Sequence, residues 1–147
     1  MTNIFTIGFT QKTAETFFTL LKKNTISMVI DVRLNNTSQL ASFSKYPDIV
    51  YFLNSICNIS YKHDVSFAPT ELTLSRYKKK VINWDEYVIE FSDTMAKREI
   101  MDYIRNNYNE LDNLCLLCSE PTAKNCHRRL VAELFKDVFP QINIIHL

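Results

Sequence analysis

Reactive and charged side chains gather in one short segment near the end of the chain. Cys118 and Glu120 close an apolar run that is typical of a buried strand, and Cys126, His127 and Arg128 stand in the first turn of a predicted helix. At such a strand-to-helix transition, backbone N–H groups and the helix dipole favour an anion. The segment therefore marks a candidate site, and its residue types are compatible with more than one reaction.

The thiol of Cys126 is the candidate nucleophile. A cysteine near a helix N-terminus and beside Arg128 is expected to have a lowered pKa, and therefore more thiolate. The competing interpretation is simple burial, which is common for free cysteines, and no local signature of a cysteine enzyme is present. His127 and Glu120 form the candidate acid/base pair. Alternatively, His127 lies at the edge of the core, where the backbone or Glu120 satisfies its ring.

A metal site would combine Cys118, Cys126 and His127, with His63 as a further ligand. Tetrahedral sites usually have closely spaced cysteines, such as C-x₂₋₄-C, whereas seven residues separate these two. Cys115 and Cys118 do form a C-x-x-C pair, but within a strand they would face opposite sides. We therefore expect no metal ligands and no other cofactor.

The elements that must position these residues alternate between strands and helices. Apolar runs predict five strands, at residues 3–7, 27–33, 59–63, 114–118 and 142–146. Helical periodicity predicts helices at residues 12–23, from Pro47 onward, from Asn83 to Tyr108 with a break near Asp93 or Thr94, and at 125–138. Residues 64–82 are less regular. The alternation predicts an α/β three-layer sandwich with a mainly parallel sheet of about five strands.

Ligands bind beyond the carboxyl ends of the strands in such sheets. The residues predicted at those ends are Gly8, Arg33, His63, Cys118 and His146. If the strands are parallel, all five approach one edge of the sheet. We therefore expect one pocket there.

Two further positions near that edge have both a structural and a functional interpretation. Gly8, the only glycine, either lets the backbone approach a ligand or provides a turn with positive φ. Asp31 and Arg33 share one face of a strand, and a buried Asp31 must be paired. We expect Arg33 at the strand end, together with Arg128, to present a planar fork to a phosphate or carboxylate.

Composition limits the classes of protein to consider. The 147 residues fit one domain over residues 1–147, and 46% hydrophobic and 22% charged residues are typical of a soluble globular protein. A formal net charge of +1 provides no global attraction to nucleic acid or membrane. No apolar run approaches the ~20 residues of a membrane span, and no secretion signal is evident. We therefore expect a cytoplasmic protein with reduced thiols.

Four short blocks, taken in order, resemble the domain-of-unknown-function 488 family, the group that includes YeaO-like proteins. They are Thr6-Ile7-Gly8-Phe9-Thr10, Asp31-Val32-Arg33, Trp84-Asp85-Glu86-Tyr87 and, as the most specific block, Leu117-Cys118-Ser119-Glu120 with Cys126-His127-Arg128. The resemblance runs from about residue 3 to residue 146. It implies a small α/β domain of Rossmann-like shape and no settled biochemical activity. The positions that the family motifs emphasise are Gly8, Asp31, Arg33, Cys118, Glu120, Cys126, His127 and Arg128.

The chain departs from the family pattern at two places. A proline and a serine often follow the Asp-Val-Arg block, whereas Leu34-Asn35-Asn36-Thr37-Ser38 follows here. A Gly-Gly pair common after the third strand is replaced by Phe67-Ala68-Pro69-Thr70, similar to a variant branch. These departures concern one wall of the expected pocket.

The sequence-based hypothesis is a protein that binds, or binds and processes, a phosphate-bearing ligand such as a nucleotide or a nucleic-acid end. Cys126, His127 and Glu120 are the candidate catalytic residues, and the candidate binding residues are Gly8, Arg33, Cys118 and Arg128. No membrane partner is expected, and no oligomeric state is assigned. One alternative is a non-catalytic interaction module in which the same cluster is a structural hydrogen-bond network. Another is a metal-assisted hydrolase.

Overall fold

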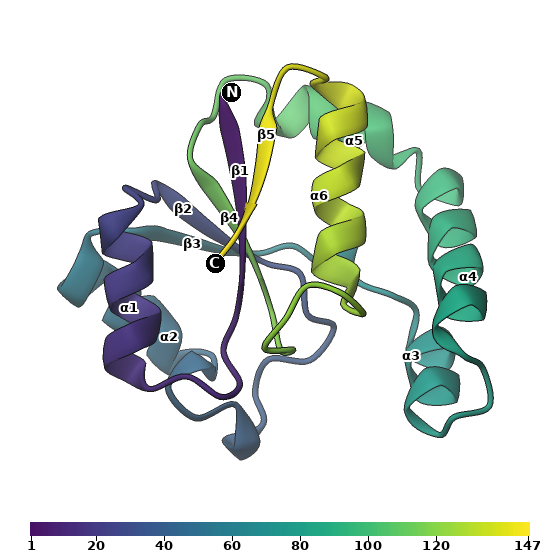
Figure 1. Ribbon diagram of the computed structural model, residues 1–147, viewed down its shortest axis with the longest axis horizontal. Helices are drawn as coiled ribbons and strands as arrows, with labels where there is room; N and C mark the ends of the chain where they lie inside the picture. Colours follow the sequence, from purple (N-terminus) through teal and green to yellow (C-terminus); the bar gives the residue numbers. More distant parts are fainter.

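The computed structural model describes residues 1–147 and contains one five-stranded sheet. All strand pairs are parallel, in the order β3-β2-β4-β1-β5 (Figure 1). The strands are β1 (Asn3–Gly8), β2 (Met28–Asp31), β3 (Ser60–His63), β4 (Leu114–Cys118) and β5 (Asn143–His146). The predicted Rossmann-like α/β fold is confirmed, with five parallel strands.

Helices cover both faces of this sheet. One face carries α1 (Ala14–Lys23) and α2 (Asp48–Phe52), which continues into a π-helical turn at Leu53–Cys57. The other face carries α3 (Glu71–Lys78), α4 (Trp84–Lys97), α5 (Ile100–Tyr108) and α6 (His127–Val138) (Figure 1). Short 3₁₀ helices lie at Gln39–Ser44 and Val65–Phe67. None of the helices has the length and apolar character that crossing a membrane requires.

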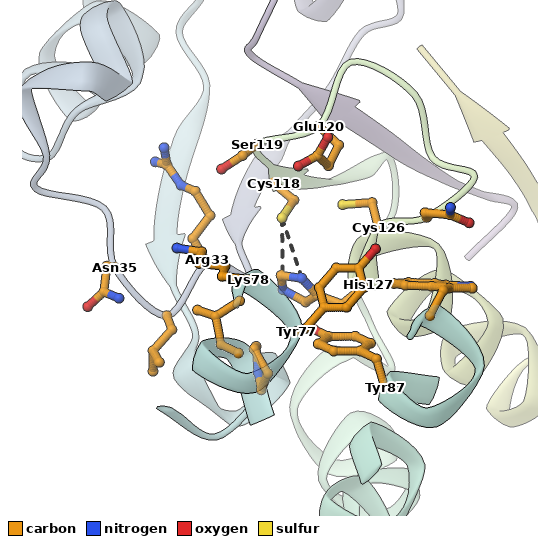
Figure 2. A pocket seen from close by; sticks show the side chains of 15 residues that line it. Arg33, Asn35, Tyr77, Lys78, Tyr87, Cys118, Ser119, Glu120, Cys126 and His127 are labelled. Carbon is orange, nitrogen blue, oxygen red and sulfur yellow. Dashed lines mark hydrogen bonds between the residues drawn. The ribbon is translucent and has the colours of Figure 1, made fainter. Parts of the chain in front are cut away.

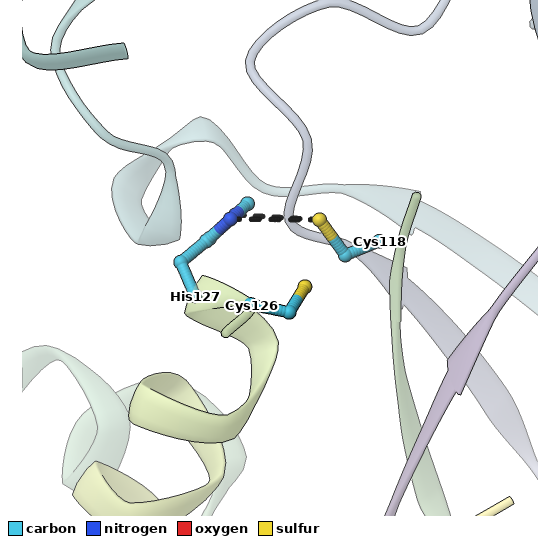
Figure 3. Close-up of side chains that lie close together, drawn as sticks. All are labelled: Cys118, Cys126 and His127. Carbon is cyan, nitrogen blue, oxygen red and sulfur yellow. Dashed lines mark hydrogen bonds between the residues drawn. The ribbon is translucent and has the colours of Figure 1, made fainter. Parts of the chain in front are cut away.

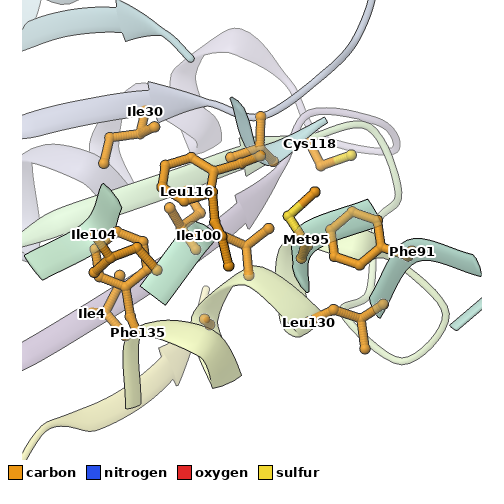
Figure 4. Packing of buried hydrophobic residues seen from close by; sticks show 14 of the residues in the cluster. Ile4, Ile30, Phe91, Met95, Ile100, Ile104, Leu116, Cys118, Leu130 and Phe135 are labelled. Carbon is orange, nitrogen blue, oxygen red and sulfur yellow. The ribbon is translucent and has the colours of Figure 1, made fainter. Parts of the chain in front are cut away.

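The central strand β4 shows why the sheet is buried on both sides. All five of its residues are buried, as expected for an interior parallel strand between two helical layers. Leu114 and Leu116 pack with α4, α5 and α6, whereas Cys115 and Leu117 pack with α1 and α2. Figure 4 shows part of the first cluster, in which Leu116 is surrounded by side chains from these helices. The core is therefore two apolar layers that the sheet separates.

Local capping explains where α4 begins. The side chain of Asn83 accepts a hydrogen bond from the backbone N–H of Glu86, and the Glu86 carboxylate accepts one from the backbone N–H of Asn83. This capping box is the pair that the sequence predicted. The predicted break between two helices is present, but its position near Asp93 or Thr94 is wrong, because α4 continues to Lys97. The chain turns instead at Glu99, which has a left-handed φ of 53°.

Three other boundaries differ from the sequence prediction. The segment expected to be irregular contains α3, whose first turn is capped by the Thr70 hydroxyl. Strand β2 ends at Asp31, so Arg33 lies in the loop beyond it. Helix α6 begins at His127, and Cys126 is its N-cap residue. These shifts place Arg33 and Cys126 in loops at the carboxyl edge, where the site lies.

Candidate functional site

A pocket of about 150 Å³ opens at the carboxyl edge of the sheet. Three segments form its walls: the loop after β2, the region from Pro69 to the start of α4, and the β4–α6 connection (Figure 2). Its lining residues are Arg33, Leu34, Asn35, Pro69, Leu74, Tyr77, Lys78, Trp84, Tyr87, Cys118, Ser119, Glu120, Asn125, Cys126 and His127. The pocket therefore has the position expected of a ligand site in a parallel α/β sheet.

Cys118 and His127 meet at the base of this pocket. The Sγ atom of Cys118 lies 3.5 Å from Nδ1 of His127 and 4.0 Å from Nε2. Nε2 lies 2.7 Å from the carbonyl oxygen of Val32. Because a carbonyl oxygen only accepts, Nε2 carries a proton and donates it to that oxygen. Burial lowers the pKa of His127, so the ring is neutral and its Nδ1 lone pair is free for the cysteine cluster.

Cys118 and Cys126 act as a coupled pair of thiols. The hydrogen bond with Cys126 lowers the pKa of Cys118, against the opposing effect of burial and with help from the Ser119 backbone N–H. The same hydrogen bond, together with burial, raises the pKa of Cys126. The expectation of a lowered pKa at Cys126 is therefore wrong. Cys118 is therefore the more acidic thiol of the pair, because the hydrogen bond favours the proton on Cys126.

Arg128 supplies the positive charge behind these sulfurs. Its side chain is fully buried, and its Nη1 donates to the carbonyl oxygen of Glu120 at 2.5 Å and approaches the Sγ of Cys126 at 3.6 Å. Its Nε donates to the Thr6 hydroxyl at 3.3 Å. No carboxylate pairs with this guanidinium, and its Nη2 has no hydrogen-bond partner. Arg128 does not line the pocket, so its charge acts from behind the thiols.

Arg33 lines the pocket, but its guanidinium is occupied. Nε and Nη2 donate to the two carboxylate oxygens of Asp31 at 2.8 and 2.7 Å, and Nη1 and Nη2 donate to the hydroxyl and carbonyl of Ser44. Asp31 also accepts from the hydroxyl of Tyr61 at 2.6 Å. The structural interpretation of the buried Asp31–Arg33 pair is confirmed. The guanidinium of Arg33 therefore holds the loop after β2 and is not presented to a ligand.

Gly8 is buried below the loop after β4 and does not line the pocket. A Cβ atom at this position would lie 1.7 Å from the carbonyl oxygen of Glu120 and 2.9 Å from Nη1 of Arg128. Its φ is not positive, so the turn interpretation is wrong. The atom that approaches Gly8 closely is the chain's own carbonyl group, and this contact fixes the position of the β4–α6 loop.

The two remaining histidines lie at the same edge but outside the pocket. His63 donates from Nε2 to the carbonyl oxygen of Arg33 at 2.7 Å and lines a separate hollow with Tyr46 and Tyr61. Nδ1 of His146 is hydrogen-bonded to the Thr6 hydroxyl at 2.6 Å. The prediction that all five strand ends share one pocket is therefore wrong. Only Arg33 and Cys118 of those five residues line it.

The sequence did not reveal the aromatic wall opposite the thiols. The rings of Trp84 and Tyr87 stack with centroids 5.1 Å apart and an interplanar angle of 15°, and Tyr77 lies 4.9 Å from Tyr87. In Figure 2, Tyr77 and Tyr87 lie beside His127. Lys78 completes this wall. The helical periodicity of Trp84 and Tyr87 resembled an ordinary core stripe, and only the packing of α3 against α4 makes them pocket residues.

The arrangement also brings metal-ligating atoms together. The Sγ atoms of Cys118 and Cys126 and a ring nitrogen of His127 all lie within 4.8 Å of one another, and all three residues are buried (Figure 3). The spacing argument against a metal therefore does not hold, because the strand end and the helix start bring the two cysteines together.

Glu120, the third candidate catalytic residue, lines the pocket with an exposed side chain.

Comparison with known proteins gives one match. The family model described as "Domain of unknown function DUF488" matches residues 13–135, which include the β4–α6 segment with Cys118, Cys126, His127 and Arg128. No curated protein and no solved structure shows significant similarity to the chain. The matched region covers most of the 147 residues. The chain therefore belongs to the DUF488 family.

Proposed function

We propose that the pocket binds a phosphate-bearing ligand, either a nucleotide or a nucleic-acid end, and that it does so in the cytoplasm. One observation carries this proposal: the open first turn of α6 lies across a small pocket from a wall of aromatic rings. A helix N-terminus favours an anion, and an aromatic wall favours the flat face of a base. A nucleotide combines both groups in one molecule.

The anionic end of the ligand would lie at the start of α6. The N-cap residue Cys126 makes no side-chain capping bond to this helix, so the first N–H groups of the helix lack that partner. Asn125, Cys126 and His127 all line the pocket, which directs the positive end of the helix dipole toward it. Lys78 adds an exposed ammonium group on the opposite wall. These groups replace Arg33 and Arg128 as the proposed phosphate contacts.

The base would lie against the aromatic wall. Trp84 is only partly buried and lines the pocket together with Tyr77. The guanidinium of Arg129 stands over the Trp84 ring at 6.0 Å, so a base that stacks on that face would displace it. Stacking on such rings contributes about 1–3 kcal/mol per base and tolerates any base. We therefore expect a preference for nucleotides over inorganic phosphate, with little discrimination between bases.

The size of the pocket and the net charge favour a small ligand or a strand end. The pocket volume of about 150 Å³ is below the roughly 300–1,000 Å³ of typical ligand sites, so the pocket would enclose only part of a nucleotide. A formal net charge of +1 provides little of the extended phosphate neutralisation on which duplex binding depends. The four cysteines are free thiols, which fits the reducing cytoplasm that we propose.

Fluorescence of the single tryptophan tests the proposal directly, because Trp84 lines the pocket. A nucleoside monophosphate should quench it in a saturable manner, whereas inorganic phosphate and the unphosphorylated nucleoside should each bind at least tenfold more weakly. The titration is done with and without added zinc, because Cys118, Cys126 and His127 of this pocket bring metal-ligating atoms together. The variant Lys78→Gln should weaken binding of the monophosphate.

The matched control is Lys79→Gln, a substitution of the next residue, which is exposed and does not line the pocket. Its affinity should equal that of the wild type. Equal affinity of nucleoside and nucleotide would contradict a phosphate site, and so would equal losses in the two lysine variants.

A further inference from the structure

We infer that Cys118, Cys126 and His127 form a three-ligand site for zinc or a similar divalent transition-metal ion, with the fourth coordination position open to the pocket. This site goes beyond the proposed ligand binding, which does not require a metal. Two sulfur ligands and one nitrogen ligand form a donor set that suits zinc. Three protein ligands and one open position are the composition of catalytic zinc sites.

The distances between the ligand atoms fit such an ion. Zinc lies about 2.3 Å from sulfur and about 2.0–2.1 Å from a ring nitrogen, so neighbouring ligand atoms of a tetrahedron are about 3.6–3.8 Å apart. The Sγ atom of Cys118 lies 3.5 Å from Nδ1 of His127, and no two of the three ligand atoms are more than 4.8 Å apart. Figure 3 shows the three side chains converging from the end of β4 and the start of α6. Shifts of about an ångström would therefore bring all three atoms into coordination.

The surroundings of His127 match those of a metal ligand. Metal-binding histidines usually donate their second ring N–H to a carboxylate or a backbone carbonyl. Nε2 of His127 donates to the carbonyl oxygen of Val32 at 2.7 Å, which leaves Nδ1 as the coordinating atom. Arg128 and Leu130, which follow on α6, are also buried, so the helix start that carries His127 is held in the core.

The positive charge of Arg128 favours an anion as the fourth ligand of the metal ion. Two thiolates neutralise a divalent ion, and the buried Arg128, which has no carboxylate partner, then leaves one positive charge beside the site. A fourth ligand that is an anion would balance this charge. Hydroxide or a phosphate oxygen would both do so, and the second case rests on the proposed function. Because the three ligands line the same pocket as Glu120 and Lys78, a metal ion held by them would adjoin the proposed phosphate site.

Metal analysis of the purified protein tests the site without any nucleotide. After incubation with zinc and removal of the excess, the wild type should retain about one zinc per chain. Cobalt substitution should give the intense absorption bands of cobalt–thiolate bonds. Cys118→Ser and Cys126→Ser should each weaken metal binding at least tenfold. The controls are Cys57→Ser and Cys115→Ser, because these thiols lie outside the cluster, and both should bind like the wild type.

Three results would overturn the inference: no stoichiometric zinc in the wild type, a cobalt complex without thiolate bands, or equal losses in cluster and control variants. If the wild type retains no metal and mild oxidation removes two titratable thiols, Cys118 and Cys126 form a disulfide couple instead. The cobalt spectrum of the wild type distinguishes these outcomes even if a serine variant fails to fold. Zinc without nucleotide binding would contradict only the proposed function, and nucleotide binding without zinc would contradict only the metal site.

Discussion

Replacing Gly8 with alanine tests how the β4–α6 loop is held in place. The added Cβ would lie 1.7 Å from the carbonyl oxygen of Glu120, so that group would have to move by more than an ångström. The same carbonyl accepts the hydrogen bond of the buried Arg128, and this bond would break. Overpacking costs about 1–3 kcal/mol, and a hydrogen bond to a charged group contributes about 1.5–3 kcal/mol. We therefore expect Gly8→Ala to lower the free energy of unfolding by about 3–5 kcal/mol.

Thermal and urea denaturation measure this loss. For a chain of 147 residues, an unfolding entropy of about 0.3 kcal/mol/K converts it to a fall in Tm of about 10–15 °C. Glu15→Ala in the exposed first turn of α1 is the control and should change stability by less than about 0.5 kcal/mol. Because the displaced loop carries Cys126, the affinity of the pocket for zinc and for nucleotide should fall as well. A Gly8→Ala protein with unchanged Tm and unchanged affinity would refute the close approach of Glu120 to Gly8.

Three other predictions concern the contacts that hold the fold. Burial alone would raise the pKa of Asp64, but hydrogen bonds from two tyrosines and the Lys62 ammonium lower this pKa. The ionised Asp64 should therefore contribute its full stabilisation above about pH 4, and this stabilisation should be lost as the pH falls through the lowered pKa. In urea denaturation, the difference in stability between wild type and Asp64→Asn should accordingly narrow in acid. Asp31→Asn leaves its buried guanidinium partner unpaired and should cost about 3–5 kcal/mol in urea denaturation, whereas Asp102→Asn breaks an exposed pair and should cost less than about 1 kcal/mol. Asn83→Ala removes the capping box of α4 and should cost about 1 kcal/mol, seen as a lower Tm.

The sequence predicted the fold because its signals are local. Each strand is a short apolar run and each long helix has an apolar stripe, so alternation alone indicated a parallel α/β sheet. The strand order could not be read in this way. The pairing of β1 with both β4 and β5 depends on contacts between segments more than a hundred residues apart. The end of α4 was misplaced because Asp93 and Thr94 resemble helix breakers, whereas Asp93 pairs with Lys97 one turn later.

The candidate site was predictable only where its residues are neighbours in sequence. Cys118, Cys126 and His127 share one strand–loop–helix unit, and the structure brings their side chains together. The roles of the arginines depend on distant acceptors. Ser44 belongs to a 3₁₀ helix, and its hydroxyl and carbonyl oxygens accept hydrogen bonds from the guanidinium of Arg33. Whether a guanidinium is free for a ligand is therefore a property of tertiary packing, and residue type does not reveal it.

The separation of the core into two layers divides the effects of mutation by face. Side chains such as Phe17 and Leu21 pack between α1 and the sheet and have no contact with the pocket. Cys118 and Cys126, in contrast, belong to the layer under α4, α5 and α6. A loosened α1 layer, detected as faster hydrogen exchange in α1, would therefore leave the two thiols in their relative positions. Substitutions in the α1 layer should therefore alter stability alone, whereas substitutions at the end of β4 and the start of α6 should alter stability and binding together.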